Sequence, residues 1–236
     1  MIGIVIPNIK HYYQENGDYK YKRYMQMKLI DLSHEININM SAYTEEEKTE
    51  ISDLATIEND GYNEKSLKIC THTGTHIDAP YHMISRGRTI DQFSLNEFLG
   101  KALIIDVKKY NYIDIDNIIK YKEKIEKSDF IIFKTGWEKY FGKEEYLEDY
   151  PSLTIEAAKW LCEFDIKGIG IDAISIDKFD SVDFKIHNTI LSKDKFIIEN
   201  LNNLSKIEDE FFTLISVPLK IKSGDAAPVR AIAIIE

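Results

Sequence analysis

Three of the six histidines in the chain fall between positions 72 and 82, in the segment His72-Thr-Gly-Thr-His76-Ile-Asp78-Ala-Pro-Tyr-His82. Imidazole nitrogen and carboxylate oxygen are the ligands that suit zinc, manganese or iron. Ligands that share one short segment are brought together at a small cost in chain entropy. The segment therefore predicts a metal site, and the chain must fold so that these side chains meet.

The spacing within this segment favours extended backbone. His76 and Asp78 are two residues apart and would point to one face of a strand. A helix would also align His72 with His76, but Gly74, the two threonines beside it and Pro80 all disfavour a helix. We expect a strand or loop with a tight bend at Gly74, where the missing side chain lets the backbone approach an ion.

His82 lies beyond the turn expected at Pro80, so it can face the site without binding the ion. The unperturbed pKa of imidazole, about 6.5, lets it take up and return a proton near neutral pH. We expect His82 to be the general acid/base. The alternatives are a fourth metal ligand or a hydrogen-bond partner of a ligand.

The composition is that of an ordinary folded protein. It has 236 residues, 44% of them hydrophobic and 30% charged, with a formal net charge of -10. That charge argues against binding to nucleic acid or to anionic membranes. Cys70 and Cys162 form no metal or redox motif, and no signal peptide or long apolar run is evident, so we expect a cytoplasmic protein. We expect one domain over residues 27–236 and an N-terminal extension over residues 1–26.

Local patterns predict a mixture of helices and strands, and hence an α/β or α+β domain with a mixed sheet. The capping boxes Thr44-Glu-Glu-Glu47 and Ser94-Leu-Asn-Glu97 predict helices over 45–58 and from 94 to Gly100. Helical patterns also cover 115–127 and 154–164. Strands are expected at 67–71, leading into the histidine segment, and at 102–107, 130–133, 168–171, 211–217 and 229–235.

Other polar and reactive residues have two interpretations each. Cys70 and Cys162 fit buried small side chains better than nucleophiles, and no Gly-Xaa-Ser-Xaa-Gly motif supports a covalent route. Trp137 is either core or a surface on which an aromatic substrate stacks. Asp172 and Asp177 either orient metal ligands or hold turns, and Gly224-Asp225 fits a turn before the last strand.

The chain resembles the cyclase-like metal hydrolases, a family that includes bacterial kynurenine formamidases and isatin hydrolases. The resemblance rests on Asp31-Leu-Ser-His34, on the histidine segment, and on motifs that extend over residues 28–236. The later motifs are Thr135-Gly-Trp137, Gly170-Ile-Asp-Ala-Ile-Ser175, His187 with Glu199, and Pro218-Leu-Lys-Ile-Lys-Ser-Gly-Asp-Ala-Ala-Pro-Val-Arg230.

This resemblance implies a fold, an activity and a set of site residues. His72, His76 and Asp78 would bind metal, His82 would be catalytic, and His187 with Glu199 would hold a second ion bridged by Asp78. The fold would be a barrel-like mixed β-sheet flanked by helices, assembled as a homodimer or homotetramer. The activity would be hydrolysis of an amide-type C–N bond in a small molecule such as N-formylkynurenine, by a metal-activated water. Zinc is the expected ion, in one or two copies, with manganese as the alternative.

Two departures bear on specificity. Formamidases usually carry a Tyr-Pro-Gly or Trp-Pro-Gly element where this chain has Asn39-Met-Ser-Ala-Tyr43-Thr44, and Ser223 stands where relatives often have glycine. Two alternatives therefore stay open. One is a hydrolase of cyclic amides or imides of the isatin type with a single metal, and the other is a binding protein without catalysis.

Overall fold

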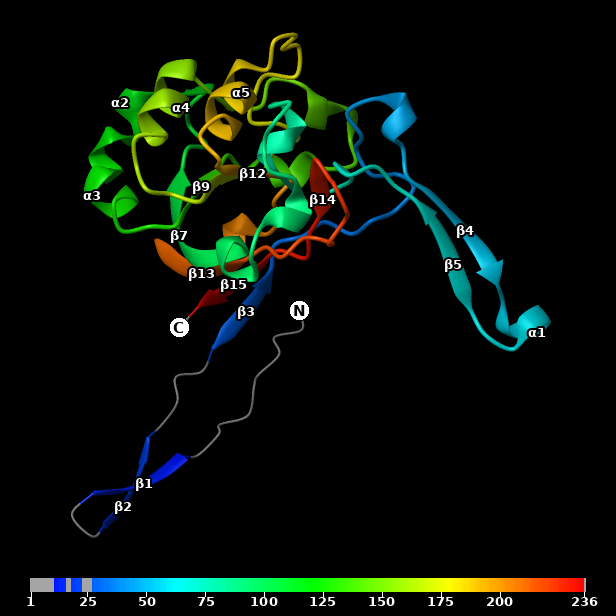
Figure 1. Cartoon of the computed structure of the whole chain (residues 1–236), viewed down its shortest axis with the longest axis horizontal. Coiled ribbons are helices and arrows are strands. Elements are labelled where there is room, and N and C mark those ends of the chain that lie inside the picture. Colours follow the sequence, from blue (N-terminus) through cyan, green and yellow to red (C-terminus); the bar gives the residue numbers. More distant parts are fainter. Residues whose placement is uncertain (1–10, 16–17, 23–26, 236) are drawn as a thin grey trace.

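A nine-stranded mixed sheet organises the chain (Figure 1). The computed structural model describes residues 11–15, 18–22 and 27–235. In spatial order the strands are β14 (Ala226–Pro228), β6 (His76–Asp78), β12 (Phe196–Glu199), β11 (Gly168–Ile171), β9 (Phe130–Lys134), β7 (Leu99–Asp106), β13 (Phe211–Ile215), β15 (Ile232–Ile235) and β3 (Lys28–Asp31).

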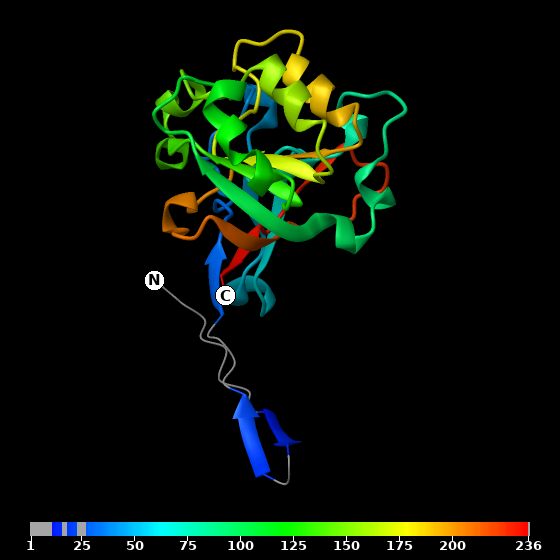
Figure 2. The ribbon, with the colours of Figure 1, turned by 90° about the vertical axis from the view of Figure 1, so that its left-hand side faces the viewer.

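Four parallel strands, β12, β11, β9 and β7, form the centre of this sheet, and antiparallel strands extend it on both sides. The sheet curls strongly (Figure 2). The chain after β3 meets the chain after β12, where Ser33 bridges Leu201 and the Asn202 amide donates to the Leu32 carbonyl at 2.9 Å. The result is a half-barrel, which confirms the prediction of a barrel-like mixed sheet flanked by helices.

Both faces of the central strands are buried, so neighbouring residues on one strand belong to different cores. Leu103 and Ile131 face a core shared with the helices, whereas Ala102 and Phe130 face the core inside the curl. The helices that cover the first face are α2 (Ile115–Ile118), α3 (Lys122–Ile125), α4 (Ile155–Leu161) and α5 (Lys185–Leu191). Apolar runs without polar alternation at 102–107 and 130–133 follow from this double burial.

Several predicted elements are confirmed, with shorter helices than expected. Helix α4 begins at its cap Thr154, whose side chain accepts from the Ala157 amide, and ends at Leu161. The stretch predicted over 115–127 is divided between α2, a 3-10 turn and α3. The Ser94 capping box is present but supports only a 3-10 helix, Leu95–Phe98, because β7 starts at the next residue.

The remaining regular elements are short. Strands β8 (Tyr112–Ile113) and β10 (Ser152–Leu153) pair with each other. The 3-10 helices are Glu45–Glu47, Pro80–His82, Ile90–Gln92, Leu95–Phe98, Ile119–Tyr121, Trp137–Tyr140, Glu144–Leu147 and Leu204–Lys206.

The predicted helix over 45–58 is wrong. Only one 3-10 turn, Glu45–Glu47, follows Thr44, and the chain then forms strand β4 (Glu50–Ala55). β4 pairs antiparallel with β5 (Glu64–Lys68), and α1 (Ile57–Asp60) lies at the turn between them. Of the apolar positions that suggested a helical face, Ala55 is buried but Leu54 is exposed, and none belongs to either core. The partner strand supplies the backbone hydrogen bonds instead.

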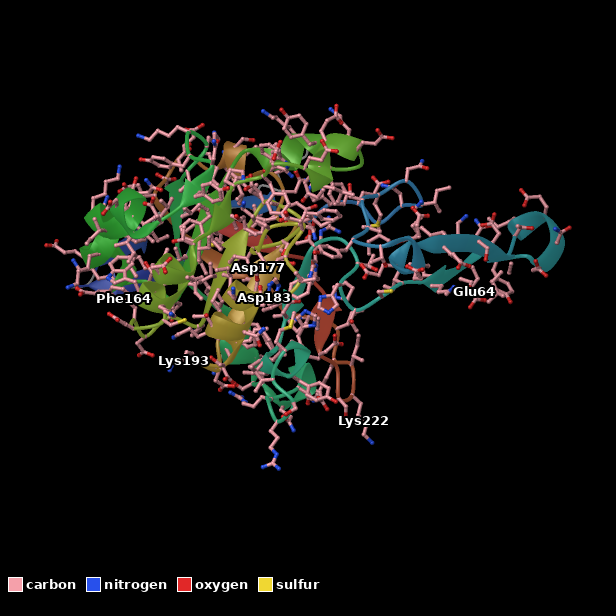
Figure 3. All side chains as sticks on the ribbon, turned by 90° about the horizontal axis from the view of Figure 1, so that it is seen from above. Glu64, Phe164, Asp177, Asp183, Lys193 and Lys222 are labelled. Carbon is pink, nitrogen blue, oxygen red and sulfur yellow. The ribbon has the colours of Figure 1, made fainter. Side chains whose placement is uncertain are left out.

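Strands β4 and β5 form an arm that projects from the body (Figures 1 and 3), with Glu64 far out along it. The strand expected over 67–71 therefore ends at Lys68, and residues 71–75 form turns and bends before β6. The arm is mostly exposed.

Strands β1 (His11–Glu15) and β2 (Asp18–Lys22) form an antiparallel pair, and among the described residues neither strand pairs with the main sheet. The rest of the predicted 1–26 extension lies outside the described residues. In the described part of the chain, no helix combines the length and the apolar character needed to cross a bilayer.

Candidate active site

Strand β6 carries the first two site residues. His76 lies opposite Glu199 of β12, and Asp78 lies opposite Ile197. Ile77, between them, points into the core inside the curl, so His76 and Asp78 point together to the other face. Both are buried, with exposed fractions of 2% and 0%. The predicted extended geometry of this pair is confirmed.

His72 reaches the same place through a bend at Gly74. Gly74 has φ +62, and a Cβ there would lie 2.9 Å from the Met40 side chain. Its carbonyl accepts from Nδ1 of His76 at 2.8 Å, which leaves Nε2 of His76 with a lone pair. Nδ1 of His72 lies 3.0 Å from Oδ1 of Asp78. The expected bend at Gly74 is therefore present and joins all three predicted ligands.

His187 and Glu199 complete the cluster from α5 and β12. Nε2 of His187 lies 3.7 Å from Oδ2 of Asp78 and 3.3 Å from Oε1 of Glu199. The other ring nitrogen, Nδ1, lies 2.7 Å from Asp177, whose carboxylate also accepts from the backbone amides at the start of α5. Asp177 therefore caps the start of α5 and orients the His187 ring.

The side chains converge on a common centre and leave its polar atoms without partners. Nε2 of His76 and both oxygens of Asp78 are buried and form no hydrogen bond within the described residues. His72 and His187 each direct one ring nitrogen to a carboxylate outside the centre, which leaves a lone pair facing Asp78. A lone pair and a carboxylate oxygen that face each other repel unless a proton or a metal cation lies between them. The donor set fits a divalent ion held by imidazole and carboxylate.

The electrostatics of the cluster show the same deficit of positive charge. Burial lowers the pKa of His72, but Asp78 and Asp225 outweigh it and raise that pKa to about 10. Burial acts likewise on His187, and Glu199 together with Asp177 and Asp78 raises its pKa well above the ordinary value. A bound cation would satisfy the same carboxylates that otherwise attract protons.

Asp78 is placed so that its two oxygens serve different neighbours. Oδ1 faces His72 and His76, at 3.0 and 3.3 Å, while Oδ2 faces His187. The ligand atoms of His72, His76 and Asp78 all lie within 4.8 Å of one another. The two oxygens of Asp78 are therefore directed to two sides of the cluster.

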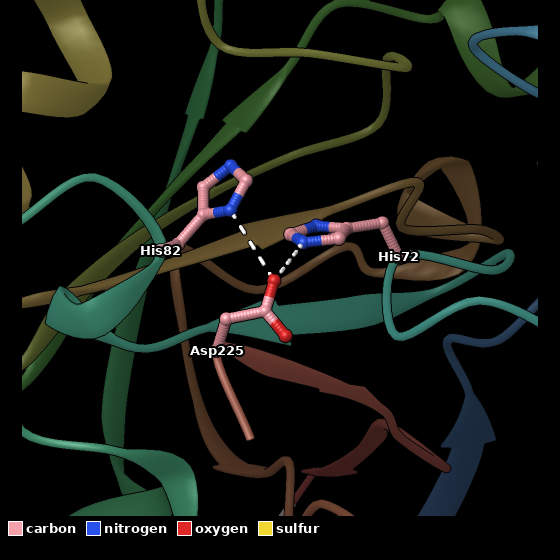
Figure 4. Close-up of side chains that lie close together, drawn as sticks. All are labelled: His72, His82 and Asp225. Carbon is pink, nitrogen blue, oxygen red and sulfur yellow. Dashed lines mark hydrogen bonds and ion pairs between the residues drawn. The ribbon is translucent and has the colours of Figure 1, made fainter. Parts of the chain in front are cut away.

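His82 ends the 3-10 helix Pro80–His82 and faces Asp225 (Figure 4). Its Nδ1 lies 3.5 Å from Oδ2 of Asp225, and the same oxygen lies 2.9 Å from Nε2 of His72. Its ring centroid is 4.2 Å from that of His72. A nitrogen of His82 also lies within 4.8 Å of Asp78 and His187, so the alternative of a fourth ligand stays open on geometry.

Asp225 is the site residue that sequence reasoning missed, because Gly224-Asp225 was interpreted as a turn. It precedes β14, which pairs with β6, and so arrives beside His72 and His82. Hydrogen bonds from His72 and then from His82 hold the pKa of the Asp225 carboxyl well below its usual range. Ser223, two residues before Asp225, has φ 55. This left-handed conformation explains why glycine would suit position 223.

The Asp31-Leu-Ser-His34 motif supports the site structurally. Asp31 pairs with Arg230, Ser33 bonds the backbone of Val229 and Ala231, and the His34 amide donates to Thr75. These contacts tie the end of β3 to the connection between β14 and β15 and, through Thr75, to the histidine segment. Burial lowers the pKa of His34 to about 4, and its ring stacks on Phe141 at 3.6 Å.

Three other candidates have structural roles. Asp172 accepts from the amides of Thr135 and Gly136, so it holds the turn after β9, and burial raises its pKa to about 6. Trp137 packs against the helix-side core and does not line the cavity described below. Cys162 packs in the same core.

A cavity of about 360 Å³ opens beside the cluster. Its lining residues are Ser41, Ala42, Tyr43, Thr44, Glu47, His72, His76, His82, Met83, Ile174, Ser175, Phe184, His187, Glu199 and Asn200. One end holds the imidazoles and carboxylates, and much of the wall is apolar or aromatic. A small molecule with an apolar body therefore fits, with its reacting group at the cluster.

Comparison with models of known protein families shows to which family the chain belongs. A family model described as "Putative cyclase" matches residues 30–178. The chain belongs to this cyclase family. The predicted family is thereby confirmed.

Curated enzymes match this chain along most of its length. The kynurenine formamidase of Bacillus cereus is 30% identical over 206 residues, which cover 86% of this chain and 95% of that enzyme. The kynurenine formamidase of Erythrobacter litoralis is 32% identical over 70% of this chain and 74% of its own length.

Solved structures agree on the fold. An isatin hydrolase bound to the product analogue thioisatinate has a TM-score of 0.80 and 23% identity, covering 89% of this chain and 92% of that one. A predicted metal-dependent hydrolase from Bacillus stearothermophilus has a TM-score of 0.76 and 29% identity, covering 89% and 99%. The chain is thus a metal-dependent hydrolase, and the prediction of an enzyme is confirmed.

We predict that Asp225→Asn weakens metal binding about 10- to 100-fold, the usual range when a carboxylate that orients a histidine ligand is lost. The neutral amide no longer holds His72 in the tautomer that directs Nδ1 inward. Competition with a chelator measures the affinity. Asp116→Asn, an exposed position on α2, is the matched control, and equal affinities for both variants would contradict this role of Asp225.

Proposed function

We propose that the protein hydrolyses an amide-type C–N bond, most like an arylformamidase acting on an N-formylkynurenine-type substrate. The observation that carries this proposal is the buried cluster in which Asp78 and His76 face inward without hydrogen-bond partners, at one end of a partly aromatic cavity. The names of the curated relatives supply the substrate class, and cavity shape and lining agree with it.

Each site residue has a role in this reaction. His72, His76 and Asp78 would hold one divalent ion, and His187, Glu199 and Asp78 would hold a second. When bound, such an ion polarises the amide carbonyl and lowers the pKa of a bound water. His82, at the cavity wall, takes the proton of the attacking water and delivers it to the departing nitrogen. The apolar walls position the substrate and exclude bulk water.

We propose zinc as the ion, with manganese as the alternative, because both suit a set of imidazoles and carboxylates. We also propose a cytoplasmic protein with one domain over residues 27–236 and an extension over residues 1–26. Support for the extension is that β1 and β2 pair with each other rather than with the main sheet, among the described residues.

We predict that His82→Ala lowers the rate of amide hydrolysis by roughly 100- to 10,000-fold, which is the usual contribution of a general acid/base. Metal content stays at the wild-type level, because His82 is not required as a ligand. Elemental analysis and a formamide hydrolysis assay are made on the same preparation. Loss of metal together with activity would instead make His82 a ligand, and an inactive wild type with metal bound would favour a binding protein.

We predict that His187→Ala removes one of two metal ions per chain and lowers hydrolysis of N-formylkynurenine. The reason is that Nε2 of His187 faces Oδ2 of Asp78 and Oε1 of Glu199, whereas His72 and His76 face Oδ1 of Asp78. Metal stoichiometry before and after substitution is the measurement. Unchanged stoichiometry and rate would eliminate the second ion and favour the single-metal reaction of the isatin type.

We propose assembly as a homodimer or homotetramer, supported by the arm of β4 and β5. The arm exposes Leu54, Ile57, Tyr62 and Leu67, with exposed fractions between 50% and 66%. Apolar side chains gathered on a projecting element are typical of a surface that another chain covers.

We predict that the double substitution Leu54→Ser, Leu67→Ser shifts the protein toward smaller species in size-exclusion chromatography with light scattering. Val182→Ser, which replaces an apolar side chain that is 94% exposed outside the arm, is the matched control. A wild type that stays monomeric at high concentration would contradict the assembly.

A further inference from the structure

The cavity wall carries one carboxylate, that of Glu47, which the proposed reaction does not use. Glu47, the last residue of the 3-10 helix Glu45–Glu47, lines the cavity, whereas Glu45 and Glu46 are exposed to solvent. Within the described residues its carboxylate forms no hydrogen bond and no ion pair. The adjacent lysine is already paired, because Nζ of Lys48 lies 2.7 Å from Oε2 of Glu45. Glu47 therefore has negative charge available to a ligand.

The other polar groups on the wall outside the histidine and carboxylate cluster are largely satisfied by the protein itself. The Tyr43 hydroxyl donates to the Phe179 carbonyl at 2.8 Å, and Oδ1 of Asn200 accepts from Tyr146 at 2.8 Å. Oγ of Ser41 accepts from the Gly142 amide at 2.9 Å. Glu47 is thus the wall residue that combines a full charge with the lack of a protein partner.

Among the described residues, no lysine or arginine lines this cavity. An anionic group placed at Glu47 would therefore meet negative charge and no side-chain cation, so the ammonium group of an amino-acid substrate, and not its carboxylate, would face Glu47. A cationic group there would meet a half-buried carboxylate, where an ion pair is screened less than at the open surface. The charge pattern favours a substrate with positive charge away from its reacting carbonyl.

The geometry of the walls limits where that charge lies on the substrate. Tyr43 and Phe184, whose ring centroids are 6.4 Å apart, supply aromatic surface to the cavity. Glu47 lies on the same segment as Tyr43, four residues later, and outside the cluster of His187 and Glu199. A ring held by the aromatic wall can thus present its amide to the cluster and a flexible side chain to Glu47.

We propose that Glu47 determines substrate specificity by binding a primary ammonium group on the side chain of an aryl amide. This inference rests on the proposed function, since it takes the amide to react at the histidine and carboxylate cluster. It assigns no chemical step to Glu47, which only binds and orients the non-reacting end of the substrate.

A matched pair of substrates tests the proposal: N-formylkynurenine and its analogue in which hydrogen replaces the ammonium group. The ratio of their kcat/KM values is measured for wild type, Glu47→Gln and the control Glu46→Gln. We expect the ratio to fall about tenfold in Glu47→Gln, as for loss of a charge-assisted hydrogen bond at the weaker end of its range. We expect the wild-type ratio in Glu46→Gln. An unchanged ratio in Glu47→Gln overturns the proposal.

Binding of the deformylated products tests the role of Glu47 without requiring catalysis. Titration calorimetry compares kynurenine with its analogue that lacks the ammonium group, on the metal-loaded protein. Weaker binding of kynurenine alone in Glu47→Gln, and still weaker binding in Glu47→Lys, supports the proposal even where no turnover is seen. Equal weakening of both ligands overturns it, whereas a wild type without hydrolysis overturns only the proposed reaction. Thermal unfolding shows that each variant is folded.

Discussion

The antiparallel pairing of β6 with β12 is the contact on which the site depends. It places His76 directly opposite Glu199 and puts Asp78 two residues along the same face, so three side chains from two distant segments meet on rigid backbone. A shift of the register by one residue would turn Ile77 toward the cluster and bury His76 and Asp78 in the core inside the curl. The apolar requirement of that core, which Ile77 satisfies, therefore enforces the geometry of the polar cluster.

A second layer of acceptors completes the cluster by fixing the histidine rings. Asp225 lies behind His72, the Gly74 carbonyl behind His76 and Asp177 behind His187. Each acceptor receives a hydrogen bond from one ring nitrogen, which leaves the other nitrogen with a lone pair directed inward. The positions of these acceptors come from different parts of the fold, namely the start of β14, the bend before β6 and the start of α5. The site is thus set up by the whole half-barrel rather than by the histidine segment alone.

How far the sequence predicts the structure depends on how local the cause is. The two-residue spacing of His76 and Asp78 and the need for glycine at the bend are local, and they follow from the residues themselves. Glu199 and Asp225 reach the site through strand pairing and His187 through the packing of α5, so spacing could not locate them. The family resemblance suggested His187 and Glu199. For Asp225, its place just before a strand, within the motif from Pro218 to Arg230, was the available signal. The helix expected over 45–58 failed because its capping signal governs one turn only, while the partner of Ile51 is Leu67, which a local window does not include.

The described elements divide the cavity into two parts of unlike origin. Sheet strands, a helix and a turn packed into the cores carry the histidine and carboxylate cluster. The wall with Tyr43 and Glu47 comes from the connection between β3 and the arm. Connections at the surface tolerate substitution and changes of length far better than buried strands do. A lineage with this half-barrel can therefore exchange one class of small molecule for another by altering a short surface segment, while its hydrolytic centre is inherited intact.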